Sequence, residues 1–272
     1  MSTSALDKTF AGSIPRLYDE YLVPLIFAPY AQDLARRIAA RAPLRVLEIA
    51  AGTGVVTRAM RERLPVTTAI VATDLNQAML DTAARIGTAG AVEWQQADAM
   101  ALPFDDASFD AVVCQFAVMF FPDKAKAFAE SRRVLRPGGA FLFNAWDQIA
   151  TNDFADVVTD AVAALFPADP PRFLARTPHG YHDVRVIEHD VRAGGFDAAP
   201  RIETIIERSR APTPRHPAIA YCEGTPLRSE IEARAPGRLR EAVDAGAAAI
   251  ARRFGSGAVD GKIQAHVVTV ER

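Results

Sequence analysis

Short apolar runs and longer helical repeats alternate along the first half of the chain. Apolar side chains recur at helical spacing from residue 31 to residue 40, and Pro43 ends this segment. An apolar run at 46–49 then leads into a glycine turn, and helical spacing resumes until Pro65. The chain is therefore expected to begin a strand–turn–helix unit at residue 46.

The same unit recurs along the chain with different residues. Apolar runs that predict further strands lie at 69–72, 92–96, 109–114 and 140–146, with helical segments between them. A helix that begins at Pro122 is expected to include Leu135, and the Pro-Gly-Gly sequence at 137–139 to turn the chain into the last run. Parallel strands joined by helices require right-handed crossovers that cover both faces of the sheet. The pattern therefore predicts a doubly wound α/β fold.

The regular alternation ends after Trp146. Residues 148–182 carry four prolines and are expected to be irregular. The remaining chain predicts a helix at 184–194, a strand at 202–206, an Arg-rich helical region at 211–260 and a final strand at 263–270. Since strand-like runs follow both 148–182 and 211–260, we interpret these two segments as helical lid additions that shape an acceptor site. We expect a single domain over residues 1–272, with a cofactor-binding core at about 40–146.

The composition is that of a globular protein without the charge of a nucleic-acid-binding surface. Half of the 272 residues are apolar, 24% are charged, and 31 basic against 33 acidic residues leave a net charge of −2. This balance excludes the broad basic surface that dominates nucleic-acid binding. The sequence shows no membrane-spanning apolar stretch and no signal-peptide pattern, and its two cysteines have no metal or redox spacing. We therefore expect a cytoplasmic protein with no membrane span and no nucleic-acid partner.

The glycine turn and the next strand end predict a site for a ligand that contains adenosine. Doubly wound sheets bind ligands at the carboxyl ends of their strands, where the strand order reverses. Gly52 and Gly54 lie in the turn after the first strand, and Asp74 ends the next strand. Glycines let the backbone approach a ligand, and the carboxylate can accept hydrogen bonds from the ribose hydroxyls. NAD is one candidate, but its fingerprint requires a third glycine where this chain has Thr57, so a ligand without a pyrophosphate fits better.

Glu48 is the most informative charged residue near this turn. It lies near the end of an otherwise apolar strand, where an unpaired charge is costly. One interpretation is an ion pair with a nearby arginine. The interpretation that we favour is a carboxylate that faces the cofactor site, above all where the ligand is cationic.

Five sequence motifs follow one another between residues 46 and 139. They are Val46-Leu47-Glu48-Ile49-Ala50-Ala51-Gly52-Thr53-Gly54; Asp74 with Asn76 and Met79; Gln96-Ala97-Asp98-Ala99 with Leu102-Pro103-Phe104; Phe109-Asp110-Ala111-Val112-Val113; and Arg133-Val134-Leu135-Arg136-Pro137-Gly138-Gly139. This order resembles the motifs of class I S-adenosylmethionine-dependent methyltransferases, and is most similar to the small-molecule group that includes the ubiquinone/menaquinone C-methyltransferases. One departure is Ala50-Ala51, where many relatives carry Gly-Cys.

The resemblance implies a fold and a cofactor. The fold is a Rossmann-like, mostly parallel seven-stranded sheet with an antiparallel last strand, and the cofactor is S-adenosylmethionine. By the same resemblance, the glycine turn flanks the methionine part of the cofactor, Asp74 binds the ribose, and Asp98 with Ala99 meets the adenine. The implied cofactor-binding residues are Tyr18, Tyr21, Glu48, Ala50, Gly52, Gly54, Asp74, Leu75, Met79, Asp98, Ala99, Gln115 and Phe116.

Four of these residues lie outside the first three motifs. Gln115 and Phe116, at the end of the fourth predicted strand, are expected to border the sulfonium. Tyr18 and Tyr21 come from the N-terminal segment 1–30, which we expect to help shape the acceptor site. The two tyrosines either close over the cofactor or take part in ordinary packing.

His179 and His182, followed by Asp183, form the clearest histidine cluster. As metal ligands they lack a third partner, so no metal is expected. A histidine suits the role of general base for an acceptor hydroxyl at neutral pH. In that role His182 is the first candidate and His179 the second. The alternative is a pair of exposed polar residues at the hinge of a lid.

These patterns together predict an enzyme that transfers a methyl group from S-adenosylmethionine to a small, apolar or aromatic molecule. Because the sulfonium is already activated, much of the catalysis can come from alignment and exclusion of water. Two alternatives stay open on the sequence, namely an NAD-dependent oxidoreductase on the same fold and a non-catalytic S-adenosylmethionine-binding protein. The sequence does not identify the acceptor, the atom that is methylated or the oligomeric state.

Overall fold

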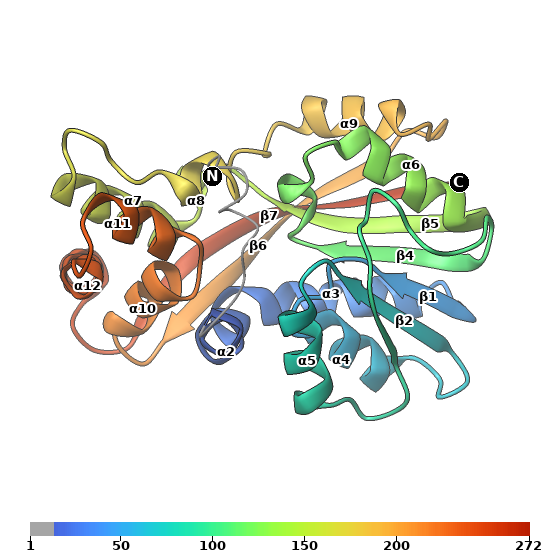
Figure 1. Cartoon of the computed structure of the whole chain (residues 1–272), viewed down its shortest axis with the longest axis horizontal. Coiled ribbons are helices and arrows are strands. Elements are labelled where there is room, and N and C mark those ends of the chain that lie inside the picture. The colour runs from blue at the N-terminus through green and yellow to red at the C-terminus, as the bar shows by residue number, and fades with distance from the viewer. Residues whose placement is uncertain (1–13) are drawn as a thin grey trace. The chain divides into compact units, whose positions relative to one another are not determined.

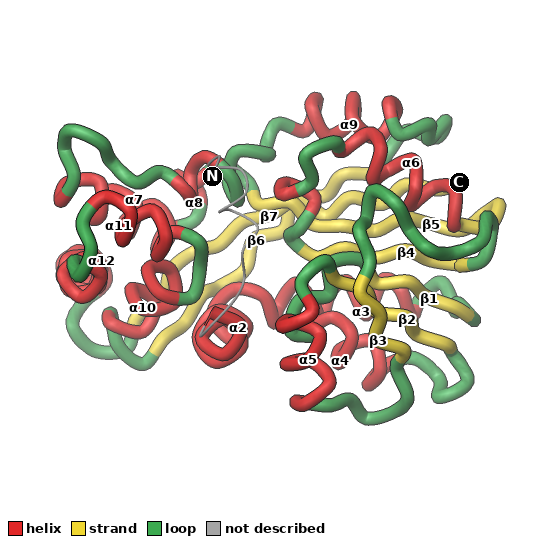
Figure 2. The backbone as a smooth tube through the Cα atoms, in the orientation of Figure 1, coloured by secondary structure: helices red, strands yellow, loops and turns green. Residues whose placement is uncertain are grey.

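The computed structural model describes residues 14–272 (Figures 1 and 2). Contacts between Cα atoms divide the chain into two compact units. The first, which we call the sheet unit, consists of residues 28–145, 181–205 and 265–272. The second, the helical unit, consists of the chain up to Phe27 together with 146–180 and 206–264. Residues 1–13 lie outside the described residues. They include the first part of the predicted N-terminal segment 1–30 and the residues from which no signal peptide was predicted.

Seven strands form one sheet in the order β3-β2-β1-β4-β5-β7-β6. They are β1 (Arg45–Glu48), β2 (Ala69–Asp74), β3 (Glu93–Gln96), β4 (Phe109–Gln115), β5 (Leu135–Trp146), β6 (Arg201–Ala211) and β7 (Val259–Glu271). The five strands β1 to β5 pair with one another in parallel. Strand β7 runs against β5, because Arg272 pairs with Gly139 and Gln264 pairs with Asp147. The predicted mostly parallel sheet with an antiparallel last strand is confirmed.

The strand order reverses beside β1, where the chain continues to β2 on one side and later to β4 on the other. The register pairs Glu48 with Ala72 of β2 and with Val113 of β4, and pairs Gln115 of β4 with Asn144 of β5. Side chains on alternate residues of a strand share one face. Asp74 and Gln115, each two residues beyond a partner of Glu48, therefore end their strands at the same level of the sheet.

Helices cover both faces of the sheet within the sheet unit (Figure 1). They are α3 (Ala28–Ala39), α4 (Val55–Arg63), α5 (Gln77–Ile86), the short 3-10 turn η2 (Val118–Phe120), α6 (Lys124–Val134) and α9 (Val184–Ala193). On one face, Leu34 of α3 and Met60 of α4 pack on Val46, Val113 and Leu142. Four phenylalanines fill the other face below α6 and α9: Phe128, Phe141, Phe143 and Phe196. The sheet therefore has a helical layer on each face, as the predicted doubly wound fold requires.

The helical unit consists mainly of short helices. They are α2 (Ile14–Leu17), the π-helical segment η1 (Tyr18–Phe27), η3 (Ile149–Thr151), α7 (Asp153–Leu165), α8 (Phe173–Arg176), α10 (Arg215–Glu223), α11 (Leu227–Arg234) and α12 (Leu239–Phe254). The expectation that 148–182 is irregular is wrong for α7, whose Phe154, Val158 and Val162 recur every fourth residue and are buried. The helical reading of 211–260 is correct for α10 to α12. That these segments act as a lid stays a prediction.

Leu135 and the Pro-Gly-Gly sequence at 137–139 were also misassigned. Leu135 is the first residue of β5 rather than part of helix α6, and 137–139 lies inside the strand rather than before it. The pairing of β4 with β5 shifts register between Phe109 and Ala111, which is the mark of a bulge. Gly138 has φ of 80°, so the irregularity is absorbed within the strand by a residue that tolerates this conformation.

Candidate functional site

The turn after β1 is shaped by backbone conformations that favour glycine. Gly52 and Gly54 have φ of 57° and 82°, and a Cβ at Gly54 would lie 2.8 Å from the Trp94 ring. Ala50 adopts φ of 54° without being a glycine. The predicted turn is therefore present, and at Ala50 it includes a strained residue.

Asp74 connects the turn to the end of β2. Its carboxylate accepts hydrogen bonds from the backbone N–H of Gly52 at 2.9 Å and of Asn76 at 2.8 Å. The side chain is only 7% exposed, and burial raises its pKa above the ordinary value while these N–H groups oppose the shift. Its oxygens thus lie at the carboxyl edge of the sheet, at the switch point where Rossmann-like proteins bind ligands.

Glu48 lies on the same face of the sheet, behind the turn. It is 2% exposed and accepts a hydrogen bond from the hydroxyl of Thr57 on α4. Burial raises the pKa of this carboxyl to about 8, and the nearby Asp74 charge acts in the same direction. The structure shows no ion pair between Glu48 and an arginine among the described residues, but the Arg58 charge and the Thr57 hydrogen bond both act to lower the pKa of this carboxyl. The sequence singled out Thr57 only because it stands where the NAD-binding fingerprint has its third glycine. In the structure Thr57 is the hydrogen-bond donor to Glu48.

The ends of β3 and β2 are joined beside Asp74. The N–H of Ala97 donates to the carbonyl of Asp74 at 3.1 Å, and Asp98 accepts from the N–H of Met100 at 2.9 Å. Ala99 is buried. The bond from Ala97 to Asp74 joins the third motif to the second, and the assignment of Asp98 and Ala99 to the adenine stays a prediction.

Two further predicted residues lie close to the turn with different surroundings. Leu75 is 51% exposed although it is apolar, and Met79 is buried with its methyl group 3.5 Å from a Cβ built on Gly52. Leu75 therefore offers an apolar surface directly beside Asp74, which is consistent with a contact to a bound base or ribose. Its assignment to the cofactor stays a prediction.

Gln115 and Phe116 end β4 at the same level as Asp74. Gln115 is buried, and Phe116 has φ of 50° and contacts the Tyr30 ring edge-on at a centroid distance of 5.2 Å. A left-handed conformation is unfavourable for a bulky residue, so packing has to hold Phe116 in place. Such strain is often found where a binding site requires a particular backbone direction.

Tyr18 and Tyr21 belong to η1 in the helical unit. Tyr18 stacks on Phe27 with ring centroids 4.9 Å apart, and Tyr21 lies 4.7 Å from the His216 ring. Burial lowers the pKa of His216. Both tyrosines thus have aromatic neighbours within their own unit, which is the packing alternative considered from the sequence. A contact with the cofactor stays a prediction.

The two histidines have different surroundings. His179 is 5% exposed, and its Nδ1 lies 2.8 Å from the carbonyl oxygen of Asp147. A carbonyl oxygen only accepts, so Nδ1 donates this hydrogen bond. The alternative of exposed hinge residues is therefore wrong for His179. His182 is half-buried, and its backbone carbonyl lies 3.1 Å from Nε2 of His266.

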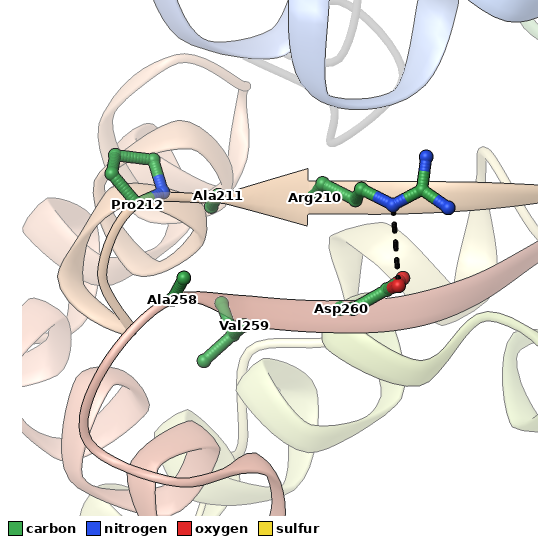
Figure 3. Close-up of a pocket in the computed structure, with 6 residues that line it drawn as sticks. All are labelled: Arg210, Ala211, Pro212, Ala258, Val259 and Asp260. Atoms are coloured by element: carbon green, nitrogen blue, oxygen red, sulfur yellow. Dashed lines mark hydrogen bonds and ion pairs between the residues drawn. The ribbon is translucent and has the colours of Figure 1, made fainter.

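A separate hollow lies in the helical unit where β6 ends and β7 begins. Its lining residues are Arg210, Ala211, Pro212, Ala258, Val259 and Asp260 (Figure 3). Asp260 pairs with Arg208 at 2.7 Å and with Arg210 at 3.2 Å, and all three side chains are substantially exposed. None of the predicted site residues lines this hollow. Within residues 14–272, no three His, Cys, Asp or Glu side chains are grouped to hold a metal ion, and no helix has the length and apolar character of a membrane span.

The geometry of the sheet unit fits a nucleoside cofactor. Asp74 can accept ribose hydroxyls, the turn at Gly52 permits close backbone approach, and Glu48 provides a buried acid. The Thr53 hydroxyl in the same turn is buried without a hydrogen-bond partner among the described residues. A buried hydroxyl without a hydrogen bond is costly, so a ligand group that binds at the turn would stabilise it by forming that bond. Fold and site together define a Rossmann-like protein that binds an adenosine-containing cofactor.

Comparison with known proteins identifies the family. Residues 47–143 match the family described as "Methyltransferase domain". A ubiquinone/menaquinone biosynthesis C-methyltransferase UbiE from Idiomarina loihiensis is 41% identical over 170 residues, which are 58% of this chain and 68% of that protein. A demethylmenaquinone methyltransferase from Deinococcus radiodurans is 37% identical over 144 residues, and the match spans 51% of this chain and 58% of that relative's length. The crystal structure of a putative methyltransferase from Bacillus halodurans, 19% identical, has the same fold with a TM-score of 0.55, covering 88% of this chain and 97% of that one.

The chain belongs to the family of S-adenosylmethionine-dependent methyltransferases that includes these UbiE-type enzymes. The cofactor expected from the sequence, S-adenosylmethionine, is thereby confirmed, and so is the assignment as an enzyme. Family membership decides against the NAD-dependent oxidoreductase and the non-catalytic binding protein. The assignment of individual residues to the cofactor or to catalysis remains a prediction from their positions.

Proposed function

We propose that this chain transfers a methyl group from S-adenosylmethionine to a ring carbon of a small quinol. The support is the set of relatives, which are named as C-methyltransferases of ubiquinone and menaquinone biosynthesis and as demethylmenaquinone methyltransferases. The observation that carries the proposal in the structure is the row of buried polar side chains, including Asp74 and Gln115, at the carboxyl edge of the sheet. This row extends from β1 and β2, whose ends suit the cofactor, to the end of β4, where an acceptor can bind.

When bound, the cofactor supplies a methyl group on a positively charged sulfur. In the proposed reaction a carbon–carbon bond would form to the acceptor ring while the cofactor sulfur keeps the electron pair of the broken bond, and the proton displaced from the acceptor carbon would pass to water. The residues of the chain bind and orient: Asp74 holds the ribose, and the turn at Gly52 admits the rest of the cofactor. Around the end of β4, Phe116, Val118 and Met119 are buried apolar side chains that exclude water.

The test is a methyl-transfer assay with isotopically labelled cofactor and a demethylmenaquinol that carries a short prenyl tail. Mass spectrometry of the product distinguishes a ring-methylated quinol from a methyl ether. A ring-methylated product supports the proposal, whereas only a methyl ether, or no transfer by a protein that demonstrably binds the cofactor, contradicts it.

Asp74→Ala provides the matching test of the cofactor site. It removes charge-assisted hydrogen bonds to the ribose, which should weaken S-adenosylhomocysteine binding by about 1.5–3 kcal/mol, or roughly 10- to 100-fold. Asp81→Ala, which removes an exposed carboxylate on α5, is the control and should bind like the wild type. Calorimetry with equal affinity for both variants would show that Asp74 does not bind the cofactor.

A further inference from the structure

Asn144 is a buried amide in the apolar run near the carboxyl end of β5. It is fully buried on β5, and neither its Oδ1 nor its Nδ2 has a hydrogen-bond partner among the described residues. A buried amide that makes no hydrogen bond destabilises a protein, and replacing it with an apolar side chain of similar shape is neutral or stabilising. Asn144 therefore carries a cost that packing alone does not explain.

The position of Asn144 in the sheet places it beside the cofactor site. It pairs with Gln115, so it lies at the level at which β4 ends, and it shares a face with Gln115, Leu142 and Glu48. On its other side, the antiparallel pairing of β5 with β7 places Val267, which is apolar, next to it. The neighbouring strand β7 thus gives Asn144 no polar side chain at this position.

The strand order also separates Asn144 from the residue expected to hold the ribose. Asp74 and Asn144 are three strands apart, on β2 and β5, with β1 and β4 between them. Adjacent strands are about 4.8 Å apart, so the two side chains are separated by roughly 14 Å along the edge of the sheet. If the ribose binds at Asp74 and the rest of the cofactor extends across the end of β1, the nucleoside lies toward β2. Asn144 on β5 then lies on the opposite side of the cofactor.

We propose that Asn144 binds the methyl acceptor, and that its amide recognises a ring oxygen. This inference rests on the proposed function, because it takes the acceptor to be an oxygenated aromatic ring. An amide suits such a ring because its N–H group donates to a carbonyl oxygen and its carbonyl accepts from a hydroxyl. Because Asn144 is fully buried, side chains around it have to move for the acceptor to reach it.

The test is Asn144→Leu, which keeps the approximate shape of the side chain and removes both hydrogen-bonding atoms. Calorimetry measures the binding of 1,4-naphthohydroquinone, kept reduced, to the protein saturated with S-adenosylhomocysteine. We expect this variant to bind the probe roughly five- to tenfold more weakly, with unchanged affinity for S-adenosylhomocysteine. The difference should shrink with 1-naphthol, which has only one of the two hydroxyls.

Ser209→Ala is the matched control. Ser209 is also fully buried, with a hydroxyl that has no partner among the described residues, but it lies on β6 in the helical unit and outside every predicted site. Removing its hydroxyl should leave the affinity for the probe unchanged. Thermal unfolding of both variants shows whether each still folds.

Each result bears on the inference. If Asn144→Leu binds both probes like the wild type, Asn144 is a structural residue and the inference is wrong. If the variant loses affinity for S-adenosylhomocysteine instead, Asn144 belongs to the cofactor site, and the inference is again wrong. A wild type that binds neither aromatic probe refutes the acceptor chemistry. Weaker binding by the variant, in a protein that does not methylate the quinol, would uphold the role of Asn144 and reject the proposed function.

Discussion

Cofactor binding should release a proton from Glu48. Burial raises the pKa of this carboxyl to about 8, so in the free protein most molecules hold it neutral at pH 7. A cationic cofactor favours the ionised carboxylate and lowers that pKa on binding. The proton must then leave as the cofactor enters, and the measured affinity includes the cost of this ionisation.

The size of the effect follows from the pKa. At pH 7 about one-tenth of the molecules carry the carboxylate, which weakens apparent binding about tenfold, or by about 1.4 kcal/mol. At pH 6 the fraction is about one-hundredth, so the dissociation constant should fall roughly tenfold between pH 6 and pH 7. The amino group of the ligand loses its own proton near pH 8, which ends the rise in affinity at higher pH.

Isothermal titration calorimetry in two buffers with different ionisation enthalpies measures the protons released. We expect close to one proton per cofactor bound at pH 7 by the wild type, and none by Glu48→Gln. Glu62→Gln, which changes an exposed glutamate on α4, should release as many protons as the wild type. Because the free ligand is the same in every titration, the difference between wild type and Glu48→Gln measures the protons coupled to Glu48. Equal proton release by these two proteins would refute the reasoning.

The remaining predictions concern stability and chemistry. Folding raises the pKa of Glu48 from about 4.5 to about 8. Between these two pH values the folded state keeps the proton and the unfolded state does not, so the free energy of unfolding should fall as the pH rises across this range. Glu48→Gln removes that loss, which is on the order of 4 kcal/mol, as denaturant titrations at pH 5 and pH 8 can show. Ala50→Gly relieves a left-handed alanine and should stabilise by about 0.5–1 kcal/mol, whereas Ala51→Gly, at a neighbouring residue without positive φ, should destabilise in the same melting assay. If an acceptor hydroxyl must ionise, His182→Ala should lower kcat at least tenfold at unchanged cofactor affinity, and the exposed His189→Ala should not; an unchanged pH–rate profile would exclude His182 as the base.

Local sequence patterns predicted the sheet and the cofactor edge because these depend on short-range signals. Apolar runs alternate with helical repeats, and glycines mark the turn after β1, so strand ends such as Asp74 were located correctly. Helix α7 was missed although its apolar residues have helical spacing, because the prolines from Pro167 onward dominated the interpretation of 148–182. Those prolines in fact come after the helix has ended.

The partners of the site residues could not be predicted, because they depend on tertiary packing. Thr57 contacts Glu48 only because α4 folds back over the end of β1, and a threonine in a helix gives no sign of this. The hydrogen bond of His179 likewise joins it to the carbonyl of Asp147, more than thirty positions earlier. Asn144 gave a visible signal, as the only polar residue in the run 140–146, but its lack of a partner appears only once the neighbouring strands are placed.

The polar side chains at the edge of the sheet explain one another once they are considered as a group. Glu48 and Asp74 are both buried acids, each with a pKa raised by burial, and Asn144 is a buried amide whose hydrogen bonds are not made within the described chain. Each of them costs free energy to bury, and Asn144, which has no partner within the described chain, makes no hydrogen bond in return. All three lie on one face of the sheet, close to the carboxyl ends of their strands. A cofactor and an acceptor bound side by side along this edge can therefore contact all three. Cofactor and acceptor would give Asn144 the hydrogen bonds that it lacks within the described chain and would add partners for the two buried acids, so binding of both should stabilise the protein more than contact area alone suggests.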